Sequence, residues 1–303
     1  MKVSIVTVNF NQPKVTEELL ATIPLTDDIE VIVVDNGSNS NISTEWQSNY
    51  PEVKFIRSEQ NLGFAGGNNL GIKNATGDYL FLVNNDTEFT ADLVAKLVSV
   101  FDKNPSVGIL SPQIKYYSNK SLIQYAGYTA MNYYTCRNSC IGLRETDNGQ
   151  YDNITAPTSY CHGAAMMVRR EAIEKAGTMN ENFFLYYEEV DWCEHIKKAG
   201  YEAWVCTDAL IYHKESVSVG KKSKLKEYFM NRNRILFIRR NAPLFNRIVF
   251  YVYFILLVVP RNVFSYIKDK NYNFIPVLFK AVWWNLTHSK NSSNLGYLIN
   301  TIS

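Results

Sequence analysis

The first hundred residues alternate between short apolar runs and segments in which apolar side chains recur at helical spacing. The apolar, β-branched runs predict buried strands at residues 3–8, 29–34, 53–57 and 79–83. After Pro13 and after Leu93 the apolar residues fall on one face of a helix. This rhythm predicts an α/β fold with a Rossmann-like, mostly parallel central sheet flanked by helices.

Polar residues stand where these predicted strands end. Asn9, Asp35 and Arg57 close the first three runs, and Asp86 follows the fourth. Ligands of open parallel sheets bind beyond the carboxyl ends of the strands, where the strand order reverses. We therefore expect these four side chains to converge on one site.

The middle of the chain is less regular. Residues 105–160 are rich in Tyr, Asn and Ser and are expected to form a β-rich flap over the acceptor side. A helix at about 186–199 and a strand at 202–206 are predicted to follow.

The charge changes sign near residue 220. Residues 1–220 hold 17 Lys and Arg against 27 Asp and Glu, whereas residues 221–303 hold 14 against 2. We expect a body of residues 1–220, with halves 1–104 and 105–220, and a C-terminal helical region of residues 221–303. A basic region of this kind suits an anionic lipid surface. No nucleic-acid motif accompanies the charge, so we expect no nucleic-acid partner.

Two apolar segments lie in this C-terminal region. Residues 248–259 are twelve consecutive apolar residues, and Pro260 is expected to end their helix. Since a crossing helix needs about 20 residues, the segment is predicted to lie in a membrane interface or on the body. Residues 274–286 form the second apolar stretch. The alternatives are a cap on the body or a contact in a homo-oligomer.

The cysteines and the N-terminus point to the cytoplasm. The five cysteines are an odd number without zinc-site spacing, which favours reduced thiols. The first apolar run is too short for a signal peptide. We expect a cytoplasmic chain that is peripheral at the inner face of the cell membrane.

An acidic cluster occupies the start of the predicted helix at 186–199. On a helix, Glu188 and Asp191 share a face with Trp192, whereas Glu189 points elsewhere. Neighbouring carboxylates raise one another's pKa, which suits a general base. The alternative is a solvated acidic turn.

Two further segments suit phosphate and metal chemistry. Residues 61–71 are rich in Gly and Asn and enter a helix, whose N–H groups can approach a phosphate closely. Asp86 could hold Mg²⁺ or Mn²⁺, and His213 could be a metal ligand or a phosphate donor. An ordinary loop, a helix cap and a structural histidine are the alternatives.

Together these segments resemble the family 2 glycosyltransferases, which have the GT-A fold, and most closely their rhamnosyltransferase-like branch. The resemblance extends from Met1 to about Asn241. The matching segments are residues 3–11, 33–38, 61–68, 84–86, 162–170, 184–191 and His213.

The resemblance implies roles for individual residues. Asp86 matches the last acid of the family's Asp-x-Asp metal motif, whose first position here is Asn84, so Mg²⁺ or Mn²⁺ would rest on Asp86 and His213. The family's base falls on Glu189, with Asp191 and Glu188 as alternatives. The residues expected at the nucleotide sugar are Thr7, Asn9, Asp35, Arg57, Asn61, Gly66, Asn84 and Asn85.

The activity implied is an inverting, metal-dependent transfer to a lipid-linked glycan in cell-surface polysaccharide biosynthesis, such as that of O-antigen or capsule. The branch favours L-rhamnose from dTDP-rhamnose, and a UDP-hexose or UDP-N-acetylhexosamine is the alternative donor. A sugar-nucleotide pyrophosphorylase is less favoured, because residues 9–12 lack the glycine-rich loop and basic pair of that class. A non-catalytic nucleotide-sugar-binding module is disfavoured by the acids near Glu189.

Overall fold

The computed structural model describes residues 2–41, 43–215 and 223–299. Its strands are β1 (Val3–Asn9), β2 (Ile29–Asn36), β3 (Val53–Ser58), β4 (Tyr79–Asn84), β5 (Thr87–Phe89), β6 (Val107–Tyr116), β7 (Asn119–Tyr125), β8 (Thr155–Pro157), β9 (Ala165–Arg169) and β10 (Glu202–His213). Its α-helices are α1 (Pro13–Leu20), α2 (Ser43–Asn49), α3 (Gly63–Asn74), α4 (Leu93–Lys103), α5 (Arg170–Ala176), α6 (Glu188–Lys198), α7 (Lys224–Asn241), α8 (Leu244–Tyr253), α9 (Val259–Lys268) and α10 (Ile275–Thr287). Short 3-10 helices lie at Glu181–Phe183 and Tyr272–Phe274, and a π-helical turn, η2, spans Phe254–Val258.

The strands form one sheet in the order β3-β2-β1-β4-β9-β6-β10-β5, with β7 beside β6 and β8 beside β10. The predicted parallel half is confirmed, because β1 pairs in parallel with both β2 and β4, and β2 with β3. The register sets Asn9 opposite Asp35 and Asp35 opposite Arg57. The polar ends of the predicted strands therefore meet at one edge, as expected.

The other half of the sheet differs from the prediction. Instead of belonging to a flap, β6 lies inside the sheet between β9 and β10, and β9 runs antiparallel to β4 and β6. Ser111, Pro112 and Gln113 interrupt the apolar pattern of β6 and hide it in the sequence. Their burial is tolerated in part because the Ser111 hydroxyl donates to the Ala165 carbonyl over 2.6 Å.

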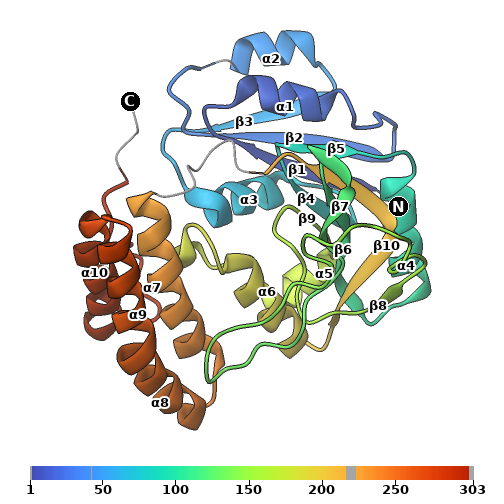
Figure 1. Ribbon diagram of the computed structural model, residues 1–303. Helices are drawn as coiled ribbons and strands as arrows, with labels where there is room; N and C mark the ends of the chain where they lie inside the picture. The colour runs from blue at the N-terminus through green and yellow to red at the C-terminus, as the bar shows by residue number, and fades with distance from the viewer. Residues whose placement is uncertain (1, 42, 216–222, 300–303) are drawn as a thin grey trace.

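Helices cover both faces of the sheet, as predicted (Figure 1). On one face, Leu19, Trp46 and Phe101 of α1, α2 and α4 share a core cluster with the strands. On the other face, Ile72 of α3 and Trp192 of α6 belong to a second cluster. The sheet is thus held in place from both sides while its carboxyl edge stays polar.

The C-terminal helices α7 to α10 gather at one side of the molecule, opposite α4 (Figure 1). A third core cluster joins Phe183 of the body to Leu236, Phe250 and Trp284 of this region. The predicted boundary at residue 220 falls outside the described residues and stays a prediction.

Pro260 does not end the helix of the first apolar segment. α8, η2 and α9 form one helix over Leu244–Lys268, 25 residues that are long and apolar enough to cross a membrane. The prediction that the segment stops at Pro260 and is too short to cross is therefore wrong. A proline ring clashes with the carbonyl four residues earlier, and the π-helical turn just before Pro260 relieves such a clash by widening the helix.

Candidate active site

Asn9, Asp35 and Arg57 form one hydrogen-bonded group at the strand edge. Asp35 is only 4% exposed, forms an ion pair with Arg57 and accepts a hydrogen bond from Asn9 Nδ2 over 3.1 Å. Arg57 also donates to the Ser38 carbonyl over 2.8 Å. Thr7 lies two residues before Asn9 in β1, fully buried, and its hydroxyl has no partner among the described residues. A carboxylate held in this way can accept further bonds from a nucleoside.

Close packing around α3 accounts for glycines in the glycine-rich segment. Gly63 has φ +72°, and a Cβ there would lie 2.3 Å from the Phe184 carbonyl oxygen. A Cβ at Gly67 would lie 2.9 Å from Val8, whereas one at Gly66 would lie 2.7 Å from Leu62 and 3.8 Å from the Glu181 side chain. Only glycine lets α3 approach both β1 and residue 184 this closely.

Asn61 and the start of α3 lie next to the group formed by Asn9, Asp35 and Arg57. The Asn61 side chain accepts from the Gly63 N–H over 2.8 Å and from Asn36 Nδ2 over 3.2 Å. Since Asn36 directly follows Asp35, the N-terminus of α3 and the Asp35 group share the same edge. The structure therefore brings Asn61 to the predicted site.

Asn85 connects the Asp35 group to Asp86. Asn85 Nδ2 donates to the Thr16 hydroxyl over 3.0 Å, and that hydroxyl donates to Asn9 Oδ1 over 3.1 Å. Asp86 is the next residue and is 8% exposed. Hydrogen bonds thus extend from the end of β2 to the segment after β4.

Asp86 and His213 face each other. His213 Nε2 lies 3.1 Å from Asp86 Oδ1 and 3.5 Å from Asn84 Nδ2. His213 Nδ1 lies 2.9 Å from Gln124 Oε1, which can only accept, so Nδ1 carries a proton. A neutral His213 then presents the Nε2 lone pair to the Asp86 carboxylate.

This donor set fits a divalent cation. Two acceptors so close are unfavourable unless a proton or a cation lies between them. Mg²⁺ and Mn²⁺ bind to few protein ligands when phosphate oxygens and water supply the rest. Among the described residues no group of three or more His, Cys, Asp or Glu could hold a metal, so the fit rests on Asp86 and His213. Gln124, absent from the sequence prediction, orients the histidine.

His162 and Gly163 connect this pair to the acidic helix. The His162 ring lies 6.3 Å from the His213 ring, and burial lowers the pKa of His162 to about 3. A Cβ at Gly163 would lie 3.7 Å from Glu189 Cγ. The sequence shows both residues only as part of a matching segment, because their position depends on the pairing of β9.

The three acids of α6 have different surroundings. Asp191 is fully buried and accepts from Arg240 Nε over 3.0 Å and from Asn241 Nδ2 over 2.6 Å. Glu188 is 3% exposed, and burial, followed by the Glu189 charge, raises its pKa well above the usual range. Glu189 alone is partly exposed, and burial raises its pKa too. The prediction that Glu189 leaves the shared face is confirmed, and Asp191 serves the structure as an ion-pair partner.

A side chain of α7 forms hydrogen bonds to the segment that precedes α6. Phe184, Tyr186 and Tyr187 all have positive φ, at 62°, 70° and 75°. The buried Asn233 Nδ2 lies 2.8 Å from the carbonyl oxygens of residues 183, 185 and 186. This contact was not predicted, because nothing in the sequence marks one asparagine of α7 above the others.

A continuous series of contacts thus joins three distant acids. Asp35 connects through Asn9 and Thr16 to the segment of Asp86. Asp86 connects through the two histidines to Gly163 and Glu189. The Asp35 group, the pair of Asp86 and His213, and a carboxylate with a raised pKa are therefore linked along this side of the molecule.

Comparisons with known sequences place this chain among glycosyltransferases. The family model for glycosyl transferase family 2 matches residues 4–177. The low-salt glycan biosynthesis hexosyltransferase Agl10 of Haloferax volcanii is 28% identical over 238 residues, which are 77% of this chain and 74% of the relative. The N-acetylglucosaminyl-diphospho-decaprenol L-rhamnosyltransferase of Mycobacterium tuberculosis is 23% identical over 239 residues, 72% of this chain and 77% of the relative.

Solved structures with low identity confirm the GT-A fold. GalNAc-T7 with UDP, GalNAc and Mn²⁺ matches with a TM-score of 0.61 and 15% identity, over 79% of this chain and 48% of that one. The mannosyltransferase PcManGT from Pyrobaculum calidifontis, in complex with GDP-Man and Mn²⁺, matches with a TM-score of 0.56 and 17% identity. The match covers 95% of this chain and 76% of that one.

The relatives and the site indicate an enzyme that uses a nucleotide sugar in glycan biosynthesis. Since the family model matches more than half of its length, the chain belongs to glycosyl transferase family 2.

Proposed function

We propose that the protein is an inverting glycosyltransferase that moves L-rhamnose from dTDP-rhamnose onto a lipid-linked glycan at the cytoplasmic face of the membrane. The observation that carries the proposal is the convergence of Asp35, Asp86 and Glu189 along one sheet edge. The L-rhamnosyltransferase of M. tuberculosis supports the choice of sugar by its name. A UDP-hexose or UDP-N-acetylhexosamine is the second candidate donor.

The donor's nucleoside would bind at the group formed by Asn9, Asp35 and Arg57. The Asp35 carboxylate has lone pairs left after its bonds to Asn9 and Arg57 and can accept from a base N–H or a ribose hydroxyl. The strand register fixes all three side chains, so little ordering is needed when the donor binds.

The donor's diphosphate would lie beside Asp86 and His213. These two residues would hold Mg²⁺ or Mn²⁺, and Gln124 would keep the histidine in the required tautomer. A cation bound there supplies charge stabilisation for the departing diphosphate.

Glu189 would remove the proton from the acceptor hydroxyl. It is the one acid of the three that is partly exposed, and it lies beside Gly163, on the side of the cation pair. Its raised pKa makes it a stronger base than an ordinary carboxylate. The freed hydroxyl oxygen then attacks the anomeric carbon opposite the diphosphate, which inverts the configuration.

A polar pocket supports an acceptor with a large polar head group. The pocket has a volume of about 380 Å³, lies between α7 and α9, and is bounded by Tyr187, directly before the acids. Lys226, Asn231 and Arg234 line it as hydrogen-bond donors, and the carboxylates Glu227 and Asp269 line it as well. These donors suit the phosphates of a lipid-linked glycan.

Transfer assays with the full chain test the proposal. We expect dTDP-rhamnose with Mn²⁺ to raise the melting temperature most among dTDP- and UDP-sugars, and the product to have the inverted anomeric configuration by NMR. Glu189→Gln should lower kcat roughly 10²- to 10⁴-fold, whereas the exposed Glu174→Gln should not. Binding without transfer by the intact chain would support a non-catalytic module instead, and a retained configuration would overturn the mechanism.

A further inference from the structure

The helix formed by α8, η2 and α9 exposes an unusual amount of apolar surface. Nine of its large apolar side chains are between 48% and 70% exposed. They are Leu244, Phe245, Ile248, Val252, Ile255, Leu256, Leu257, Phe264 and Ile267. Soluble monomers rarely expose contiguous apolar patches above a few hundred Å². An exposed apolar surface of this kind marks a site of interaction.

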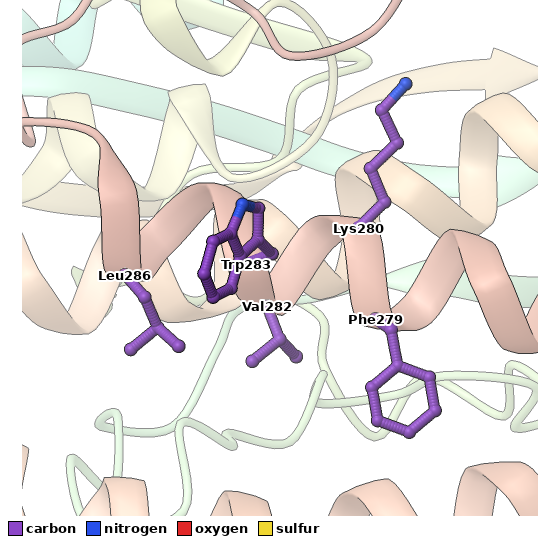
Figure 2. A pocket seen from close by; sticks show the side chains of 5 residues that line it. All are labelled: Phe279, Lys280, Val282, Trp283 and Leu286. Atoms are coloured by element: carbon purple, nitrogen blue, oxygen red, sulfur yellow. The ribbon is translucent and has the colours of Figure 1, made fainter.

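α10 extends this face. Phe279, Trp283 and Leu286 are 53%, 65% and 65% exposed and, with Val282, line a shallow apolar groove (Figure 2). Val282 also packs against the core cluster of Phe250, which places the groove beside the α8–α9 helix. We call the exposed side chains of both helices the apolar face.

We propose that the apolar face inserts into a bilayer with anionic headgroups, with the Leu244–Lys268 helix lying in the plane of the membrane. Although that helix is long enough to cross, its opposite side is occupied. Phe250, Phe254 and Val258, at intervals of four residues, are at most 1% exposed and pack with Leu236 of α7. A crossing helix would pull α7 and the adjoining catalytic body into the hydrocarbon.

The surrounding charge favours anionic lipid over a second copy of the chain. Arg261, Lys268, Lys270 and Lys280 are exposed on or next to the helices that carry the apolar face. In Figure 2, Lys280 extends to the opposite side of α10 from Phe279, Val282 and Leu286. Two copies meeting through this face would bring their basic residues together, whereas anionic headgroups neutralise them. Insertion of aromatic and aliphatic side chains beside such cations is typical of interfacial helices.

The docked orientation brings the proposed acceptor to the site. The pocket beside Tyr187 is bounded by Asn262 and Tyr266 of α9, the same helix that carries the apolar face. A lipid-linked glycan would therefore approach the acids from the membrane side. This last step rests on the proposed function, whereas docking itself is measurable without turnover.

Vesicle flotation of the full chain tests docking. We expect it to float with vesicles of phosphatidylcholine and phosphatidylglycerol more than with phosphatidylcholine alone, and less at high salt. Leu256→Glu and Phe264→Glu should each lower partition on the order of tenfold or more, since each loses over 1 kcal/mol of apolar burial. Leu25→Glu, at a site 50% exposed on the body, is the matched control. Equal flotation of all variants would overturn the proposal.

Spin labels distinguish a helix that lies in the membrane plane from one that crosses the membrane. In a Cys140→Ser background, labels at positions 248, 256 and 264 should report similar shallow depths, because the helix lies flat. A much deeper label at 256 would indicate crossing and overturn the in-plane arrangement.

A dimer that forms without vesicles and that Phe264→Glu dissociates would assign the apolar face to a second copy of the chain instead. Transfer to a water-soluble acceptor analogue should survive in the docking variants, so its loss in every form would count against the proposed function alone.

Discussion

Three carboxylates within four residues begin α6, yet their surroundings give them different properties. Asp191 is tied to Arg240 and Asn241, and Glu188 is buried with no partner for Oε2 among the described residues. Glu189 keeps partial access to solvent. The N-terminus of a helix stabilises negative charge, which limits the cost of placing the acids together.

The pKa of Glu189 predicts the acid side of the pH profile. Burial raises this pKa above the ordinary value of 4.5. A base acts only after losing its proton, so kcat/KM should be full above the raised pKa and fall as the pH drops through it. Because Glu188 lies next to it, the midpoint belongs to the pair. Rates between pH 4 and 9 check this, and a profile that stays flat down to 4.5 would contradict it.

The contact between Gln124 and His213 predicts an effect on metal affinity. Gln124→Leu removes the acceptor for Nδ1, so the ring loses its fixed tautomer and orientation. We expect Mn²⁺ affinity, measured by EPR or calorimetry in the presence of nucleoside diphosphate, to fall roughly 10- to 100-fold. Gln124→Glu keeps an acceptor and should retain most of the affinity. Unchanged Mn²⁺ affinity in the leucine variant would contradict the orienting role of Gln124.

At the scale of elements, α7 positions the catalytic helix. Asn233 of α7 bonds to the segment before α6, and Arg240 and Asn241 bond to Asp191 within α6. The positive φ values of residues 184, 186 and 187 are each costly by about 1–3 kcal/mol and persist only when the surroundings enforce them. α7 provides part of that enforcement.

Replacing Asn233 tests this positioning. Asn233→Ala removes the donor shared by three carbonyl groups, and Glu189 should lose its fixed place. We expect kcat to fall roughly 10- to 100-fold with little change in donor Kd, because β1 to β3 hold the nucleoside group independently. Asn285→Ala is the control, since it removes a buried amide whose hydrogen-bond partners among the described residues, the Arg232 and Ala281 carbonyls and the Arg239 guanidinium, all belong to α7 and α10. A parallel loss in both variants, or in kcat and Kd together, would indicate a general structural role.

At the scale of the whole molecule, the C-terminal helices are part of the fold. Arg232 is fully buried without a carboxylate partner among the described residues, and burial lowers its pKa to about 10. Its guanidinium lies 3.8 Å from the ring centre of Trp284 on α10. The body, α7 and α10 thus share one core, so the membrane-facing helices are also structural.

Two neighbouring tryptophans allow the structural role of α10 to be tested apart from its proposed role at the membrane. Trp284 is 2% exposed, whereas Trp283 is 65% exposed. Trp284→Ala should lower the free energy of unfolding by about 3–5 kcal/mol in urea denaturation. Trp283→Ala should change it by less than about 0.5 kcal/mol but weaken vesicle flotation. Similar stability losses in both would contradict the assignment of Trp283 to the apolar face.

The sequence by itself determined the parallel half of the sheet and its polar edge. The runs ending at Asn9, Asp35 and Arg57 are local signals, since continuous burial imposes an apolar composition and strand ends admit polar residues. The same holds for the faces of α6, which follow from helical periodicity. Strand ends and residue chemistry also singled out Asp86, His213 and the acids of α6, and the resemblance ranked Glu189 first among those acids.

The tertiary structure alone decided the rest, because long-range contacts outweighed local pattern. β6 contains Ser111 and Pro112 yet lies inside the sheet, where the Ala165 carbonyl accepts from the Ser111 hydroxyl. The helix passes Pro260 because a π-helical turn relieves the clash. Gln124 and Asn233 acquire their roles only through partners far along the chain, to which residue spacing gives no clue.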